Sequence, residues 1–154
     1  NLMPGIGDPV FEKLSANLAK AMFSIGAVRS FEIGDGIAVS KAKGSENNDA
    51  FIIASDGSIK KETNHSGGIL GGISDGSTIS MRIGFKPTPS ISTAQHTVTR
   101  DGHEIEVHVK GRHDPIIAPR AVVVVESMAA LTVLDAVLSN MSAQMDGIIQ
   151  FYQN

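Results

Sequence analysis

The sequence contains no cysteine. This absence excludes disulfide bonds, thiolate nucleophiles and cysteine-ligated metal sites, and it fits a reducing compartment, so we expect a cytoplasmic protein. No uninterrupted apolar run reaches the roughly 20 residues that a membrane span needs, so no membrane partner is predicted. Neither sign of charge is in large excess. The formal net charge is −3, and nothing in the composition indicates a nucleic acid as partner.

The chain has 154 residues, of which 42% are hydrophobic and 19% are charged. This size predicts a single domain, residues 1–154, whose core buries roughly 70% of the surface of the unfolded chain. The chain opens on Asn1 rather than on methionine, and it shows no basic segment followed by an apolar signal segment. We therefore expect it to begin inside a longer protein.

Two segments are predicted to be helices. Asp8-Pro9 is typical of a helix start. Apolar residues then follow at helical spacing until about Gly26, namely Phe11, Leu14, Leu18, Ala21, Met22 and Ile25. Residues 121–138 are apolar nearly all round, with Glu126 and Asp135 as the only charges, which predicts a helix buried on most sides.

Strands are predicted between these helices. Residues 28–42 alternate around two glycines and predict a strand with a bulge or bend. Residues 78–85 alternate cleanly and predict a second strand. Residues 97–100 and 104–109 flank Asp101-Gly102, which predicts a hairpin with a type I′ turn. This order indicates the α+β class, a layered β-α-β arrangement with antiparallel strands and two long core helices.

Residues 43–76 are rich in Gly, Ser and Asn and predict a long irregular loop region, with a short strand at 51–53. Within it, residues 67–72 read Gly-Gly-Ile-Leu-Gly-Gly. Paired glycines let a backbone approach a flat or charged ligand closely. The run is neither a Walker loop nor a Rossmann fingerprint, because no Gly-Lys-Ser/Thr follows it and no strand precedes it. A flexible loop and a ligand cradle both remain open.

The sequence Lys-Gly-Arg-His-Asp-Pro at 110–115 places a cation, an imidazole and a carboxylate side by side between hydrophobic segments. Arg112 and Asp114 can hold an anionic ligand if they are partly buried, with the carboxylate kept ionised. The alternative is a turn whose charges simply face water.

The sequence Phe-Lys-Pro-Thr-Pro-Ser at 85–90 ends a predicted strand with a cation and two hydroxyls. Lys86 can meet a phosphate as a point charge, and Thr88 and Ser90 can donate hydrogen bonds to it. The alternative is a proline-terminated edge strand with a solvated lysine.

No metal site is predicted. His103 and His108 lie five apart on one predicted strand, so their side chains point to opposite faces. His65 and His96 have no carboxylate or imidazole at chelating spacing. A serine nucleophile is equally unsupported, because Gly-x-Ser-x-Gly is missing.

Seven blocks of the chain carry a resemblance in a fixed order: Pro-Gly-Ile-Gly-Asp-Pro-Val-Phe at 4–11, then residues 21–28, 32–36, 44–49, 67–72, 85–91 and 110–115. Together they resemble the C-terminal portion of the chorismate synthase family. The resemblance covers nearly the whole chain, except residues 51–61 and the tail after about Ser139. Several independent blocks in register are far more specific than any single motif.

The resemblance implies an activity, a cofactor and an assembly. The family converts 5-enolpyruvylshikimate-3-phosphate to chorismate by a 1,4-anti elimination of phosphate and a ring hydrogen. Reduced FMN is required, although there is no net redox change, and the enzymes are homotetramers. By the resemblance, Arg112 clamps substrate and flavin, and Asp114 stands near flavin N5 to assist deprotonation; these two are the implied catalytic residues.

The resemblance also implies which residues hold the cofactor. Lys86, Thr88 and Ser90 would hold the phosphate tail and the ribityl chain of FMN, and Gly71 with Gly26-Ala27 would let the backbone lie close to it. The full implied set is Gly26, Ala27, Gly71, Lys86, Pro87, Thr88, Pro89, Ser90 and Arg112.

The chain departs from the family pattern in two ways. Gly26 stands where the family usually has Asn, so only a backbone contact is expected there. The family's enzymes are also much longer, and their N-terminal blocks, which supply essential histidines and most substrate-binding arginines, have no match here. We therefore expect half of the active site to be missing. The alternative hypotheses are a flavin- or anion-binding module without catalysis and a chain that only packs in an oligomer.

Overall fold

The computed structural model describes residues 2–153 and has the predicted α+β composition with antiparallel strands. The helices are α1 (Leu14–Phe23), α2 (Gly44–Asn47), α3 (Ala118–Asn140) and α4 (Met145–Gln153), with 3-10 turns η1 (Val10–Glu12) and η2 (Gly36–Lys41). The strands are β1 (Val28–Ile33), β2 (Phe51–Ile53), β3 (Ile59–Lys61), β4 (Ile69–Leu70), β5 (Ile73–Ser74), β6 (Met81–Phe85), β7 (Gln95–Val98) and β8 (Glu104–Val107). They form antiparallel pairs: β1 with β6, β2 with β3, β4 with β5, and β7 with β8.

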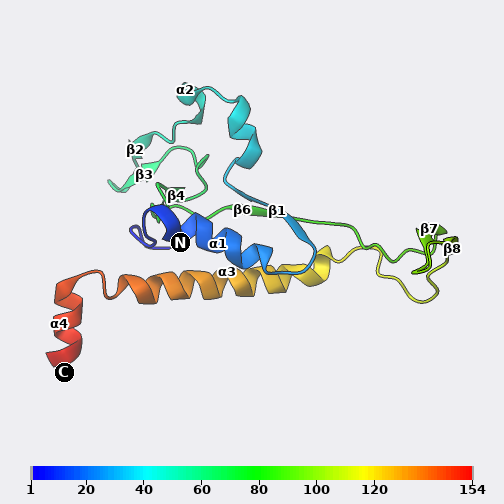
Figure 1. Cartoon of the computed structure of the whole chain (residues 1–154). Coiled ribbons are helices and arrows are strands. Elements are labelled where there is room, and N and C mark those ends of the chain that lie inside the picture. The colour runs from blue at the N-terminus through cyan, green and yellow to red at the C-terminus, as the bar shows by residue number, and fades with distance from the viewer. Residues whose placement is uncertain (1, 154) are drawn as a thin grey trace.

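The molecule is elongated along α3 (Figure 1). Helix α1 packs against α3 and also contacts β1, which pairs with β6. The β7–β8 hairpin projects beyond one end of α3, and α4 turns away at the other.

The first helix begins later than the sequence predicts. Val10 adopts φ +61°, outside the helical region, and only the turn η1 follows Pro9. Helix α1 starts at Leu14, whose N–H donates to the Gly72 carbonyl at 2.8 Å, so a distant segment sets its first residue. The predicted inner face is confirmed at Leu14, Leu18 and Met22, all fully buried, but Phe11 is 86% exposed.

Strand β1 ends at Ile33, nine residues before the predicted end at Ala42. Gly34 has φ +56°, and a Cβ built on it would collide with the His65 backbone oxygen, so the chain turns here into η2. The predicted bulge exists, but it lies between Val28 and Ser30 rather than at the glycines. The predicted second strand is confirmed as β6, beginning at Met81.

Residues 43–76 are ordered into short elements, which corrects the prediction of an irregular loop. They contain α2 and two small hairpins, β2–β3 and β4–β5, and the predicted strand at 51–53 is confirmed as β2. No apolar periodicity in the sequence predicts these hairpins, because each strand has only two or three residues. A buried ion cluster, described below, holds them together.

The predicted hairpin at Asp101-Gly102 forms, but with a different turn. The Thr99 N–H donates to the His103 carbonyl at 2.8 Å, which leaves a three-residue loop, 100–102, between the closing residues. Gly102 is the third loop residue and has φ +82°. A three-residue loop that ends in a left-handed residue is the next commonest hairpin connection after the two-residue turns.

Helix α3 is confirmed over residues 118–140, but the prediction that it is buried is wrong for this chain. None of its residues is buried, and Val123 and Leu131 are each 61% exposed. By length and composition it could cross a membrane, with a mean hydropathy of 2.1 over 18 residues. However, a core helix that lacks part of its cover passes the same test. Ala129 and Ala136 do pack on the core around Leu18, which indicates a protein environment.

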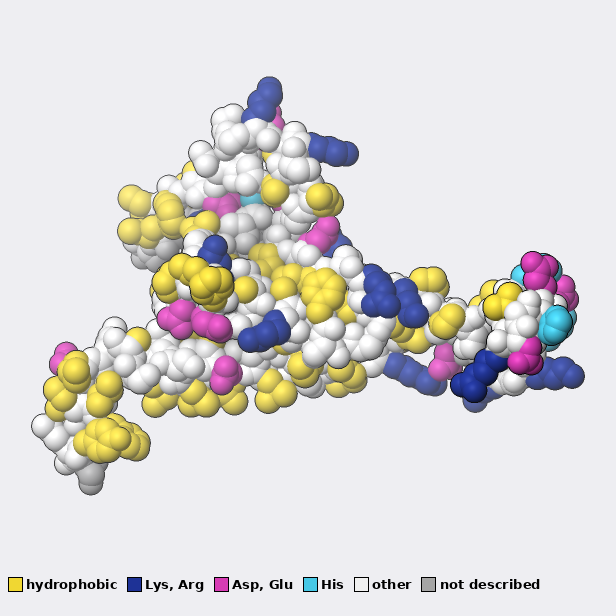
Figure 2. Space-filling model, in the orientation of Figure 1, with side chains coloured by type: hydrophobic (Ala, Val, Ile, Leu, Met, Phe, Trp, Pro, Cys, Tyr) yellow, Lys and Arg dark blue, Asp and Glu magenta, His cyan; other side chains and the backbone are white. Residues whose placement is uncertain are grey.

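The exposed surface of the whole chain is large for its mass. It measures 11,173 Å², whereas a compact monomer of 16.2 kDa exposes about 7,500 Å². Folding thus removes only about half of the unfolded surface, instead of the predicted 70%. Figure 2 shows hydrophobic side chains along the outer edge of α3 and on α4. The chain therefore exposes apolar surface that a compact monomer of the same mass would bury.

Candidate functional site

The predicted phosphate-binding segment follows β6 directly and lies beside the turn between α1 and β1. The Lys86 N–H donates to the Ala27 carbonyl at 2.9 Å. Ala27 has φ +71°, and an added Cβ at Gly26 would meet no atom within 4 Å, so this turn offers open backbone. The structure thus brings together two of the predicted cofactor-binding segments, whose contacting residues Ala27 and Lys86 are 59 positions apart.

A hydrogen bond joins the same segment to the predicted catalytic loop. The Thr88 hydroxyl donates to the Asp114 carbonyl at 3.2 Å. Pro89 accepts a bond from the Gln95 side chain at 2.9 Å, and Ser90 is exposed. Lys86 and Pro87 line a groove of about 330 Å³, together with Ile83, Phe85, Pro115, Ile116, Ile117 and Ala118.

The Asp114 carboxylate pairs with a residue that the sequence interpretation missed. Arg120, in the first turn of α3, places Nη1 at 2.7 Å from Asp114 Oδ2. Both side chains are more than one third exposed, so the pair orients the carboxylate more than it stabilises the fold. Among the described residues, Asp114 Oδ1 and the Arg112 guanidinium make no hydrogen bond or ion pair. Both groups are therefore free to meet a ligand.

Gly71 lies apart from these residues. It forms the tip of the β4–β5 hairpin with Gly72, whose carbonyl is bonded to the first residue of α1. Ala27 follows the last turn of the same helix, and ten helical residues span about 15 Å. The chain therefore holds Gly71 near one end of α1 and the other predicted cofactor contacts near the other end.

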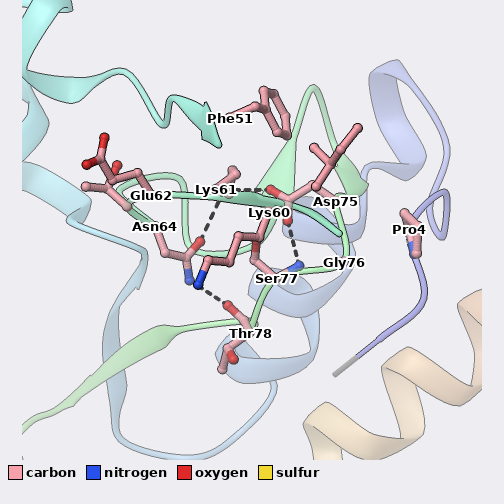
Figure 3. Close-up of a pocket in the computed structure, with 12 residues that line it drawn as sticks. Pro4, Phe51, Lys60, Lys61, Glu62, Asn64, Asp75, Gly76, Ser77 and Thr78 are labelled. Carbon is pink, nitrogen blue, oxygen red and sulfur yellow. Dashed lines mark hydrogen bonds and ion pairs between the residues drawn. The ribbon is translucent and has the colours of Figure 1, made fainter. Parts of the chain in front are cut away.

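A buried lysine organises the region that contains the glycine run. Lys61 Nζ lies 3.0 Å from Asp49 Oδ2 and 2.8 Å from Asp75 Oδ2, and the three side chains are 2%, 4% and 8% exposed. The ammonium also donates to Asn64 Oδ1 at 3.2 Å and to Ser66 Oγ at 2.7 Å. Figure 3 shows Lys61, Asn64 and Asp75 converging at the base of a cleft of about 600 Å³. No spacing rule in the sequence predicts this cluster, because its members come from three separate segments.

The cluster keeps its groups charged. Burial by itself would raise the pKa of Asp49, but hydrogen bonds from Ser66, Thr63 and the His65 N–H hold that pKa far below its ordinary value. Burial likewise opposes ionisation of Asp75, yet Lys61 and Ser77 lower its pKa. Burial would lower the pKa of Lys61, but both aspartates raise it. The ion cluster is therefore present across the neutral range.

We expect the stability of the chain to depend on pH through this cluster. Carboxylates with a lowered folded pKa contribute stability above their unfolded pKa of about 3.9, and this contribution is lost as the pH falls below that value. Lys61, with a raised pKa, contributes below about pH 10.4 and loses its contribution above it. The urea concentration at the unfolding midpoint should therefore stay constant between about pH 5 and 9 and should fall at lower and at higher pH. Asp75→Asn should make the acid limb shallower, and a midpoint unchanged down to about pH 2.5 would contradict this account.

Other titratable groups form pairs rather than metal sites. His65 Nδ1 lies 2.6 Å from Asp35 Oδ2, and Arg82 pairs with Glu32 across β1 and β6 at 2.7 Å. Within residues 2–153, no three His, Cys, Asp or Glu side chains gather as metal ligands would. The pairing of Asp35 with His65 was also missed from the sequence, because 30 residues separate the two.

The comparisons with known proteins agree on one family. A family model described as chorismate synthase matches residues 1–138. The chorismate synthase of Agathobacter rectalis is 64% identical over 149 residues, which are 97% of this chain and 40% of that protein. Chorismate synthase 1, chloroplastic, of Solanum lycopersicum is 54% identical over 142 residues, which are 92% of this chain and 32% of that protein.

A solved structure gives the same result in three dimensions. A crystal structure of chorismate synthase is similar with a TM-score of 0.72 at 27% identity, covering 92% of this chain and 36% of its own. The chain thus spans about 40% of the length of the first relatives. The resemblance noted in the sequence is confirmed: this chain belongs to the chorismate synthase family.

Proposed function

We propose that this chain is the C-terminal portion of a chorismate synthase and acts only with the portion of the enzyme that precedes it. The complete enzyme would convert 5-enolpyruvylshikimate-3-phosphate to chorismate by a 1,4-anti elimination of phosphate and a ring hydrogen. The observation that carries the proposal is the gathering of Ala27, Lys86, Thr88 and Asp114 in a chain of this family. These residues are far apart in the sequence and meet in the fold, and the family pattern implies cofactor and substrate contacts for them, which supports the proposal.

The groups in this gathering fit part of a flavin mononucleotide. Lys86 is an exposed cation suited to a phosphate, and the groove beside it has apolar walls from Ile83 and Phe85. The open backbone at Gly26 leaves room for close approach. When bound, reduced FMN would supply electron density to the allylic system as phosphate departs.

The residues of this chain would then have separate tasks. Lys86 would bind the phosphate tail, and Thr88 would fix the loop by its hydroxyl bond to the Asp114 backbone. Arg112, free of partners among the described residues, would bind the anionic substrate. Arg120 holds Asp114 Oδ2, which leaves Oδ1 to accept a proton as general base.

We also propose a cytoplasmic homotetramer in which the remaining portion of the enzyme covers the outer face of α3. The large exposed surface and the hydrophobic side chains of α3 support this cover. The tomato relative is named chloroplastic, so location differs among relatives. Light scattering on the complete protein tests the tetramer, and a monodisperse monomer would contradict it.

The experiment uses a fusion, called the chimera below: the portion of the Agathobacter rectalis relative that precedes its aligned segment, followed by this chain. Under anaerobic conditions with reduced FMN, the chimera should release phosphate from 5-enolpyruvylshikimate-3-phosphate, whereas this chain alone should not. No release by a folded chimera would contradict the proposed activity. If the chimera binds FMN without turnover, the alternative of a flavin-binding module is favoured.

We expect Lys86→Ala to weaken FMN binding to the chimera by about 10- to 100-fold. A hydrogen bond to a charged group contributes about 1.5–3 kcal/mol, and the phosphate would lose its point charge. Lys41→Ala, which removes an exposed lysine at the end of η2, is the matched control and should leave the affinity unchanged. Fluorescence titration measures both. Equal affinities for the two variants would remove Lys86 from the flavin site.

A further inference from the structure

We propose that Lys61 is a positioning residue that holds the glycine hairpin, residues 66–75, in the shape that meets the cofactor. The inference rests on the proposed function and on the flavin contact that the family resemblance implies at Gly71, because the hairpin serves catalysis only if its tip contacts the flavin. Neither the sequence patterns nor the resemblance assigned Lys61 any role. Its geometry carries the proposal.

The ammonium of Lys61 is shared among more acceptors than it has donors. Its three N–H groups face four oxygens, on Asp49, Asn64, Ser66 and Asp75, at 2.7–3.2 Å. These acceptors belong to three segments: the one before β2, the one after β3 and the one after β5. The buried Lys61 ammonium thus links three connecting segments that no common helix or sheet joins.

Both ends of the glycine hairpin are attached to this charge. At the front, Asn64 Oδ1 accepts from the Gly68 N–H at 2.8 Å, and Ser66 donates to Asp49 at 2.6 Å. At the back, the Asp75 N–H donates to the Gly68 carbonyl at 3.1 Å. Residues 66 and 75 are therefore held at a fixed separation, which sets the direction in which the tip points.

The hairpin needs such an anchor because its own short strands cannot fix its conformation. Strands β4 and β5 have two residues each, and Gly67, Gly68 and Gly71 have φ of +63°, +81° and +61°. Glycine loses more conformational freedom on folding than any other residue, so a free segment of this composition samples many shapes. The tip, in contrast, is open: a Cβ on Gly71 would meet no atom within 4 Å, which leaves its backbone accessible to a ligand.

The test compares Lys61→Met with Lys60→Met in the chimera. Lys60 precedes Lys61 on β3 but is exposed, so the same chemical change is made one residue away from the cluster. Lys61→Met leaves two buried carboxylates without a cation, and we expect amide hydrogen exchange at residues 67–72 to accelerate by at least about 100-fold. FMN affinity should fall by about tenfold or more, and Lys60→Met should change neither.

Milder variants keep the proposal testable if Lys61→Met does not fold. Asp75→Asn leaves one complete Lys61–Asp49 pair, and Ser66→Ala removes the hydroxyl contacts to Asp49 and Lys61 but no charge, so both should fold. Each should accelerate exchange at residues 67–72 more than exchange in α1, and each should weaken FMN binding in proportion.

The outcomes separate the two proposals. If hydrogen exchange at residues 67–72 is unchanged in both mild variants, or if exchange in α1 accelerates equally, Lys61 does not hold the glycine hairpin. A loosened hairpin with unaltered FMN affinity and turnover would overturn its positioning role. If the unmutated chimera neither binds FMN nor releases phosphate, the proposed function fails and the positioning role fails with it, while the exchange data still decide whether Lys61 holds the hairpin.

Discussion

Asp114→Asn in the chimera is expected to lower the rate of phosphate release by about 100- to 10,000-fold, the usual contribution of a positioned general base. The amide keeps the shape of the carboxylate and can still accept a bond from Arg120, but it cannot take up a proton. FMN affinity should change by less than about threefold, because no cofactor contact depends on the charge of Asp114. Single-turnover phosphate release and flavin titration measure the two quantities separately.

Asp101→Asn is the matched control for this substitution. Asp101 lies in the exposed three-residue loop of the β7–β8 hairpin. It should leave turnover unchanged. If Asp114→Asn retains more than about one tenth of the activity, Asp114 is not the base. If it abolishes FMN binding as well, its role is in binding rather than in proton transfer.

Leu18→Ala is expected to lower the free energy of unfolding of the chain by about 2–5 kcal/mol. Leu18 is fully buried and packs with Leu14 and Ile69, so α1 and the glycine hairpin share this contact. A small core has few neighbours that can move into the space left by the removed methyl groups, which places the cost toward the upper part of the range. Urea unfolding followed by circular dichroism measures it.

Leu131→Ala makes the same change on the exposed face of α3. Leu131 is 61% exposed in this chain, and its truncation should cost no more than about 0.5 kcal/mol here. In the chimera, where we propose that α3 is covered, the same substitution should cost about 2 kcal/mol or more. Equal costs in the two proteins would mean that the added portion does not pack on this face.

The charged side chains of the proposed site are open to solvent in this chain, which weakens their interactions. The side chains of Lys86 and Arg112 are exposed, that of Asp114 is 37% exposed, and Lys86 lines the groove next to β6. Groups that are more than one third exposed interact weakly with charges in water. A covering portion that excludes water would strengthen each of these contacts, which is why activity is expected of the complete enzyme only.

Local patterns in the sequence determined the elements of this protein. Apolar residues at spacings of three and four predicted the inner face of α1, at Leu14, Leu18 and Met22, and the apolar run predicted α3. Asp101-Gly102 predicted a hairpin between β7 and β8. Such features depend on neighbours within a few residues, so they can be recognised without the fold. The family could be recognised as well, because several blocks in one order are specific.

Only the tertiary structure decided where elements end and which charges meet. The Gly72 carbonyl sets the start of α1, the His65 backbone forces the turn after β1, and Lys61 collects partners up to 14 residues away. Asp114 owes its position to Thr88, 26 residues before it, and to Arg120. These contacts join segments with no shared periodicity, so no local pattern encodes them. The same reason explains the exposure of α3, because burial of an apolar helix depends on which other segments pack against it.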